Sequence, residues 1–183
     1  GGKLTTYRSL AQETVDQVFK RLGRKVPRCA TAHMLFPGAR INNWDAYRSQ
    51  LAENTDLGRE TVDRLVNIYG ARAGDIIDLA RREPSLQEVL DPETGAIGAE
   101  LVFTFRTEFC RTLTDALIRR IMVGLNRNCG RDALERAAIL LAADQGWDAT
   151  RKDREIEDYL TYIRRFDVPG ANAAADLAHS AAE

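Results

Sequence analysis

Apolar residues recur at helical spacing through most of the chain, and the strongest stripe lies in residues 97–125. Thr112 and Asp115 form a capping-box pattern, which predicts that a long helix starts there and continues to the end of that stripe. Residues 97–109 fit both a four-residue step and the alternation of a strand. A helix is predicted for them because no other segment offers a strand partner. The stripe in the second half consists of Leu113, Leu117, Ile118, Ile121, Met122 and Leu125.

Shorter stripes of the same kind predict a series of helices that end at glycine or proline. The predicted fold class is therefore all-α, an irregular bundle of about six to eight short helices, preceded by an N-terminal helix and an extended linker. The other predicted helices cover about residues 7–22, 44–53, 59–69, 72–82, 131–145 and 149–166.

Turn residues divide the chain into four parts. Residues 1–23 hold the first helix, and residues 24–43, which contain several prolines, glycines and asparagines, form the linker. Residues 44–167 form a C-terminal helical domain. The alanine-rich residues 168–183 form a tail that we expect to fray.

Composition excludes several classes of function. The chain of 183 residues can form one domain with an attachment, and its net charge of −1 argues against a nucleic-acid partner. Its three cysteines lack metal-ligand spacing, and their odd number favours a reducing, intracellular setting. No dinucleotide fingerprint, phosphate loop or zinc motif occurs, and His33 and His179 stand alone, so no metal site is predicted.

Charged residues are dense in residues 97–125 for so apolar a segment. One interpretation is a pair of core helices with solvated, charged edges. The other is a partly buried network of arginines and carboxylates that fixes the angle between the two helices. The residues concerned are Glu100, Arg106, Glu108, Arg111, Asp115, Arg119 and Arg120.

The first residues carry the most specific pattern. Gly1 and Gly2 precede a helix, where a glycine backbone can approach a ligand closely and free amides attract negative charge. Taken alone, the two glycines are also compatible with an expression scar. Residues 1–11, Gly-Gly-Lys-Leu-Thr-Thr-Tyr-Arg-Ser-Leu-Ala, resemble the signature Gly-Gly-Lys-x-x-(small)-Tyr-Arg-x-x-Ala of FAD-dependent glycerol-3-phosphate dehydrogenases.

Later segments resemble the same family in the same order, up to about residue 166. Phe36 and Ala39 depart from the family's usual Leu-Pro-Gly-Gly linker. The matching segments are Leu35-Phe36-Pro37-Gly38, Tyr69-Gly70 with Ile76-Ile77, Ala99-Glu100, Arg106-Thr107-Glu108, Thr112-Leu113-Thr114-Asp115, Arg119-Arg120 and Gly146-Trp147-Asp148.

The resemblance implies oxidation of sn-glycerol 3-phosphate to dihydroxyacetone phosphate, with electrons passing through FAD to a quinone. The resemblance also implies a catalytic role for Lys3, beside the anionic substrate or a developing alkoxide. A helix start suits this place, because a reduced flavin gathers negative charge along its N1–C2=O edge. For Arg8 we expect an ion pair on the helix face. The implied cofactor-binding residues are Gly1, Gly2, Lys3, Leu4, Thr5 and Thr6.

Members of the family carry a large FAD-binding domain before this point, and residues 1–183 contain none of it. The chain is therefore expected to be a C-terminal fragment that binds no FAD and is inactive alone. The complete enzyme would be cytoplasmic or peripheral on the inner membrane face. The first helix would pack on the FAD domain; alone, it is predicted to pair with a second copy or to fray. Its apolar stripe consists of Ala11, Val15, Val18, Phe19 and Leu22.

Two other functions fit the same residues. The chain could belong to a glycerophosphate oxidase, a relative that passes electrons to oxygen instead of quinone. It could also be a free-standing helical module that binds other proteins, since residues 44–166 contain no visible active site.

Overall fold

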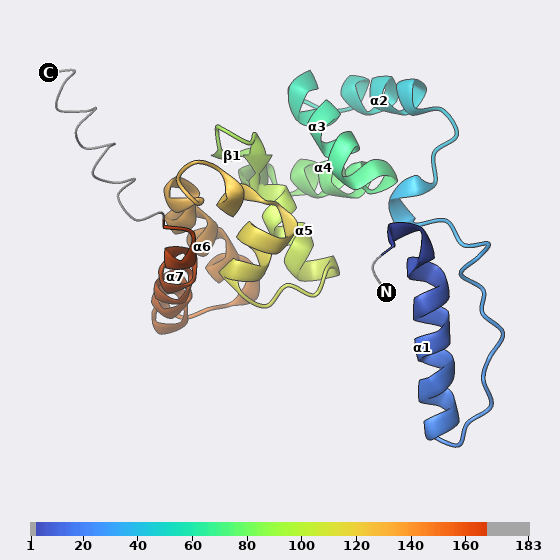
Figure 1. The fold of residues 1–183 in the computed structure, drawn as a ribbon. Coiled ribbons are helices and arrows are strands. Elements are labelled where there is room, and N and C mark those ends of the chain that lie inside the picture. The colour runs from blue at the N-terminus through green and yellow to red at the C-terminus, as the bar shows by residue number, and fades with distance from the viewer. Residues whose placement is uncertain (1–2, 168–183) are drawn as a thin grey trace, which may run out of the picture.

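The computed structural model describes residues 3–167. Helix α1 (Tyr7–Arg21) follows directly from a 3-10 turn at Leu4–Thr6, and a left-handed glycine, Gly23, comes soon after it. Figure 1 shows α1 apart from the other helices, with the linker returning beside it. We call α1 and the linker as far as the 3-10 turn at Pro37–Ala39 the arm. None of the α1 residues is buried.

Three helices follow the arm, and their predicted bounds are confirmed to within one residue. They are α2 (Trp44–Glu53), α3 (Arg59–Tyr69) and α4 (Ala73–Arg82). Asn43 caps α2 by accepting a hydrogen bond from the backbone N–H of Ala46 at 3.0 Å.

The remaining helices complete an all-α body, as the periodicity predicts. They are α5 (Gly98–Thr107), α6 (Arg131–Gln145) and α7 (Ala149–Ile163). Residues from α3 through α7 form the core, and Leu65, Leu101, Leu141 and Ile163 are fully buried in it. The Tyr159 hydroxyl donates to the carbonyl of Cys129 at 2.9 Å, and its burial raises the pKa of Tyr159.

A small antiparallel hairpin, formed by β1 (Val89–Asp91) and β2 (Ala96–Ile97), precedes α5. The helix predicted for residues 97–109 is confirmed, but the expectation that no segment could pair with its start is wrong. Strands this short leave too few residues to show alternation. Buried Asp91 accepts from the backbone N–H of Thr94 and from the Asn126 side-chain amide, each at 2.9 Å.

The long helix predicted for residues 113–125 is wrong. Its start is confirmed, since the Asp115 N–H donates to Thr112 Oγ1 and the Thr112 N–H donates to Asp115 Oδ2, both at 3.1 Å. The helix then widens into a π-turn at Asp115–Arg120 and ends. Met122 takes a left-handed φ of 57°, which leads into a 3-10 turn at Val123–Leu125.

Close packing at Gly124 accounts for this change of direction. A Cβ added there would lie 2.3 Å from Ile118 Cδ1 and 2.5 Å from the Tyr159 hydroxyl. The chain therefore leaves the helix to bring a residue without a side chain against the core.

The loop between α5 and the π-turn presents a large aromatic residue to solvent. Phe109 has a left-handed φ of 60° and is 86% exposed. Neighbouring Cys110 is buried and donates its backbone N–H to the Thr104 carbonyl at 3.4 Å. A bulky residue in this conformation is strained, and the anchored flank holds it there.

Candidate functional site

The N-terminal motif leads straight into α1. Lys3 is extended, and its carbonyl accepts from the N–H and the hydroxyl of Thr6 at 3.1 and 3.0 Å. The side chains of Lys3, Leu4 and Thr5 are exposed, and the N–H groups of a first turn have no partner within the helix. Gly1 and Gly2 lie outside the described residues. The arrangement can offer an ammonium group and backbone donors to an anion.

Arg8 lies one turn further along α1. Its guanidinium donates to Gln12 Oε1 at 3.2 Å, in place of the predicted ion pair. The residue four positions ahead on the same helix face is Gln12, so Arg8 meets a side-chain amide there and not a carboxylate.

An apolar groove of 480 Å³ runs between α1 and the returning linker. It contains part of the predicted α1 stripe, and nothing within residues 3–167 fills it. Val18 and Leu22 of the same stripe are exposed beyond it. Representative lining residues are Tyr7, Ala11 and Val15 on the helix side and Met34, Leu35 and Phe36 on the linker side.

The arm is attached to the helical domain by a backbone contact between Gly38 and Gly70. A Cβ on Gly38 would lie 2.8 Å from the Tyr69 carbonyl oxygen, and one on Gly70 would lie 2.1 Å from the Gly38 carbonyl oxygen. Gly70 also has φ 60° and ψ −131°, a conformation that only glycine adopts without strain. Two segments that resemble family motifs therefore meet in space, at the end of the arm that carries the N-terminal motif (Figure 1).

Behind Gly70 lies a buried polar cluster. The Glu100 side chain is 0% exposed, pairs with Arg64, and accepts from the Tyr69 hydroxyl at 2.9 Å. Its other contact is the backbone N–H of Ile97, which donates to it at 3.0 Å and so caps α5. Burial, with the nearby Glu100 charge, raises the pKa of Tyr69. Every contact is internal, so Glu100 stabilises the fold and is not placed to act on a substrate.

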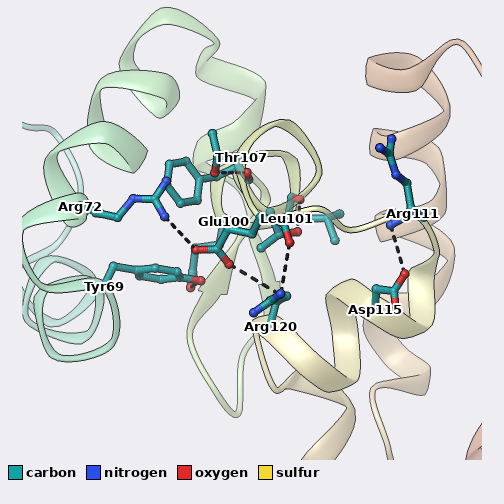
Figure 2. A network of polar contacts seen from close by, with 11 residues as sticks. Tyr69, Arg72, Glu100, Leu101, Thr107, Arg111, Asp115 and Arg120 are labelled. Atoms are coloured by element: carbon teal, nitrogen blue, oxygen red, sulfur yellow. Dashed lines mark hydrogen bonds and ion pairs between the residues drawn. The ribbon is translucent and has the colours of Figure 1, made fainter. Parts of the chain in front are cut away.

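A second, partly exposed cluster surrounds Glu108. Arg72 donates to Glu108 Oε1 at 3.2 Å and stacks on the Phe103 ring at 4.5 Å. Arg120 donates to the Glu108 carbonyl oxygen at 3.2 Å, and Figure 2 shows Arg72 and Arg120 reaching the cluster from different directions. This cluster joins the 3-10 turn at Gly70–Arg72, just before α4, to the loop that carries Phe109.

The other charged residues of the predicted network pair near the surface. The Arg106 Nε donates to Asp144 at 2.9 Å and its Nη1 to Glu83 at 2.9 Å, with the Arg106 side chain 42% exposed. Arg119 donates to Asp115 at 2.7 Å. Burial acts to raise the pKa of Asp115, but hydrogen bonds from the Arg111 N–H and from Thr112 outweigh it and lower that pKa. The Arg106 contacts tie α5 to α6 and to the end of α4, whereas the Arg119–Asp115 pair lies within the π-turn, so these contacts do not set one angle between two long helices.

Comparison with known proteins identifies the family. Residues 29–152 match the protein family described as "C-terminal domain of alpha-glycerophosphate oxidase". This match covers more than half of the 183 residues. The chain belongs to this family.

Individual relatives agree with the family match. The glycerol-3-phosphate dehydrogenase of Synechocystis sp. is 35% identical over 175 residues, which cover 92% of this chain and 31% of that protein. The mitochondrial glycerol-3-phosphate dehydrogenase of Mesocricetus auratus is 30% identical over 168 residues, covering 89% of this chain and 23% of that protein. The chain thus spans about a third or less of the relatives it matches. No solved structure matches the chain.

Two kinds of site are missing from the described part of the chain. Residues 3–167 contain no group of histidine, cysteine or acidic side chains that could hold a metal ion. None of the helices in that range combines the length and apolarity needed to span a membrane.

Sequence reasoning missed the partners of the residues that it singled out. Arg64 and Arg72 are each 36 positions from the carboxylate that they contact. No local pattern reports such a pairing.

Proposed function

We propose that this chain acts as the C-terminal helical domain of an FAD-dependent enzyme that oxidises sn-glycerol 3-phosphate to dihydroxyacetone phosphate. The single observation that carries the proposal is the exposed Lys3 motif at the start of a helix, in a chain of this family. The names of the relatives supply the substrate class.

Lys3 has the chemistry that this role needs. When bound, FAD would accept the hydride from C2 of the substrate. The Lys3 ammonium would hold the substrate phosphate or stabilise the oxygen that gains charge as the proton leaves. The turn at Leu4–Thr6 would present backbone N–H donors to the same negative region. Gly1 and Gly2 would complete the contact by allowing close approach.

The groove and stripe of the arm support a docking role for α1. In the proposed enzyme the FAD-binding domain would cover this face, since burial of such side chains is favourable by roughly 1.5–3 kcal/mol each. The proposed electron acceptor is a quinone, with the enzyme peripheral on the inner membrane face. Transfer to oxygen, as the family description suggests for an oxidase, is the second candidate.

A chimera tests the role of Lys3. This chain would replace the matching C-terminal segment of the Synechocystis glycerol-3-phosphate dehydrogenase. We expect Lys3→Met to remove most turnover, by roughly 10²–10³-fold as for comparable electrostatic groups. Far-UV circular dichroism should remain unchanged. Lys20→Met, in the last turn of α1, is the matched control and should leave turnover intact. Near-normal turnover of the Lys3 variant would show that this lysine is only structural.

The chain by itself gives a second test. We expect purified protein to be colourless and to show no stoichiometric flavin absorbance after incubation with FAD. A stable flavin band would contradict the proposed division of labour between domains.

Self-association distinguishes the alternative of an interaction module. In the chain alone, the uncovered α1 stripe is proposed to pair with a second copy. Light scattering after size exclusion should show concentration-dependent association, and a variant beginning at residue 26 should lose it. A strictly monomeric full chain whose α1 stripe is buried against its own helical domain would contradict the proposed docking role of α1.

A further inference from the structure

We propose that the helical domain contains a second anion site, which binds a small phosphate monoester between the Phe109 loop and the α6–α7 turn. The site is a hollow of 300 Å³, and none of its lining residues belongs to the arm or to the N-terminal motif. It is lined by Phe105, Cys110, Arg111, Gln145, Trp147 and Arg151.

Two guanidinium groups and no carboxylate line this hollow. Arg111 is held through its backbone, whose N–H donates to Asp115 at 3.1 Å, while its guanidinium pairs with no acid among residues 3–167. Figure 2 shows the Arg111 side chain extending away from Asp115. Arg151 pairs with Glu155, which is itself buried and also accepts the Leu113 N–H at 2.8 Å. Arg111 therefore leaves one positive charge uncompensated at the rim.

Aromatic side chains shape the rest of the site. Trp147 packs edge-on against Phe105, with ring centroids 5.8 Å apart, and Arg151 lies 5.6 Å from the Trp147 ring centroid. These contacts keep the Arg151 guanidinium near the hollow. Gln145 donates one amide N–H to Asp144 and retains another for a ligand.

The donor set and the size select the ligand class. Two guanidinium groups with an amide match the several oxygens of a phosphate better than the two of a carboxylate. A hollow at the lower end of ligand-site volumes suits a body of a few carbon atoms, which Phe105 and Trp147 would contact. The site lies in the α5–α7 part of the domain, apart from α1 and Lys3 (Figure 1), and does not depend on the proposed oxidation.

Trp147 provides a direct reporter. In the full chain carrying Trp44→Phe, Trp147 is the remaining tryptophan. Titration with inorganic phosphate and with sn-glycerol 3-phosphate should give a saturable change in fluorescence, confirmed by calorimetry, with a Kd of about 1 mM or lower. Equal affinities would assign recognition to the phosphate alone, and tighter binding of the ester would add contacts to its carbon body.

Variants decide whether the hollow is responsible. Arg111→Gln should weaken binding roughly 10- to 100-fold. Because its guanidinium has no partner in residues 3–167, the fold should be retained, as checked by circular dichroism. Arg154→Gln, on exposed α7 surface beside Asp158, is the matched control and should leave binding unchanged. No saturable signal, or an Arg111→Gln variant that binds as well as the parent chain, would overturn the proposal. Loss of binding in Lys3→Met would assign it to the N-terminal motif instead.

Discussion

The arm and the helical domain use the same kind of sequence with opposite results. Leu22, the last residue of the α1 stripe, and Leu65 of α3 both lie on apolar helix faces, yet Leu22 is 62% exposed and Leu65 is 0% exposed. An apolar stripe shows that a helix has a face to cover, but it does not say which molecule covers it. The apolar face of α3 is covered by other elements of the same domain, whereas no segment of residues 3–167 covers the apolar face of α1.

The same contrast holds for polar groups. Glu100 in the domain is enclosed by Arg64, Tyr69 and the backbone, whereas Lys3 of the arm has an exposed side chain. A buried charge needs partners in its own fold, while a charge kept for a ligand must stay open. The Glu100 charge therefore stabilises the domain, whereas the Lys3 charge stays open, as its proposed role requires.

The largest expected effect tests the enclosed charge. Glu100→Ala should lower the free energy of unfolding by roughly 3–5 kcal/mol, because it leaves Arg64 and Tyr69 without their partner. Glu88→Ala breaks an exposed pair with Arg136 and should cost about 0–1 kcal/mol. Urea unfolding followed by circular dichroism measures both. Equal losses would return Glu100 to the solvated-edge interpretation.

A matched pair of leucines tests the contrast directly. Leu65→Ala should cost roughly 2–5 kcal/mol, as for other fully buried leucines, whereas Leu22→Ala should change stability by less than about 0.5 kcal/mol. The same urea titrations apply. A large loss at Leu22 would mean that the α1 stripe is packed within the chain after all.

The attachment of the arm comes next in size. Gly70→Ala should cost roughly 1–3 kcal/mol and separate the arm from the domain, since its Cβ would overlap Gly38. Gly23→Ala is the control, because Gly23 shares a left-handed φ but has no neighbour within 4 Å. Proteolysis of the linker should accelerate only in the Gly70 variant. Identical rates in the two variants would show that the contact does not hold the arm.

The smallest effect is a gain. Phe109→Gly should raise the free energy of unfolding by about 0.5–1 kcal/mol, because glycine relieves the left-handed strain and little buried area is lost. Thermal unfolding can resolve this difference. A loss of stability would indicate that the exposed ring packs within the domain in solution.

The sequence predicts the fold where local signals agree. Asn43 and Gly70 mark ends of α2 and α3, so those bounds could be predicted. The helix expected through Leu125 does not form, because its four-residue repeat crosses Met122, which has a left-handed φ, and Gly124, which packs closely against Ile118 and Tyr159. Tertiary contacts there override periodicity.

The candidate site divides in the same way. The Lys3 motif could be found from the sequence because its residues are contiguous, and its role remains a prediction. The pairing of Arg64 with Glu100 and the hollow beside Arg111 could not, because each joins residues from separate elements. Resemblance to a family identified the segments, but only the fold shows which of them meet.

The Gly38–Gly70 contact attaches the arm to the domain at one end, and this end lies near the N-terminal motif. Helix α1 has 15 residues, so its length is about 22 Å. A rotation of the arm by about 10° about the Gly38–Gly70 contact would move its far end, near Gly23, by about 4 Å at that length. The end near Tyr7 and Pro37 would move far less. A small rotation of the arm would thus displace mainly its end near Gly23, while Lys3 would nearly keep its position relative to the domain.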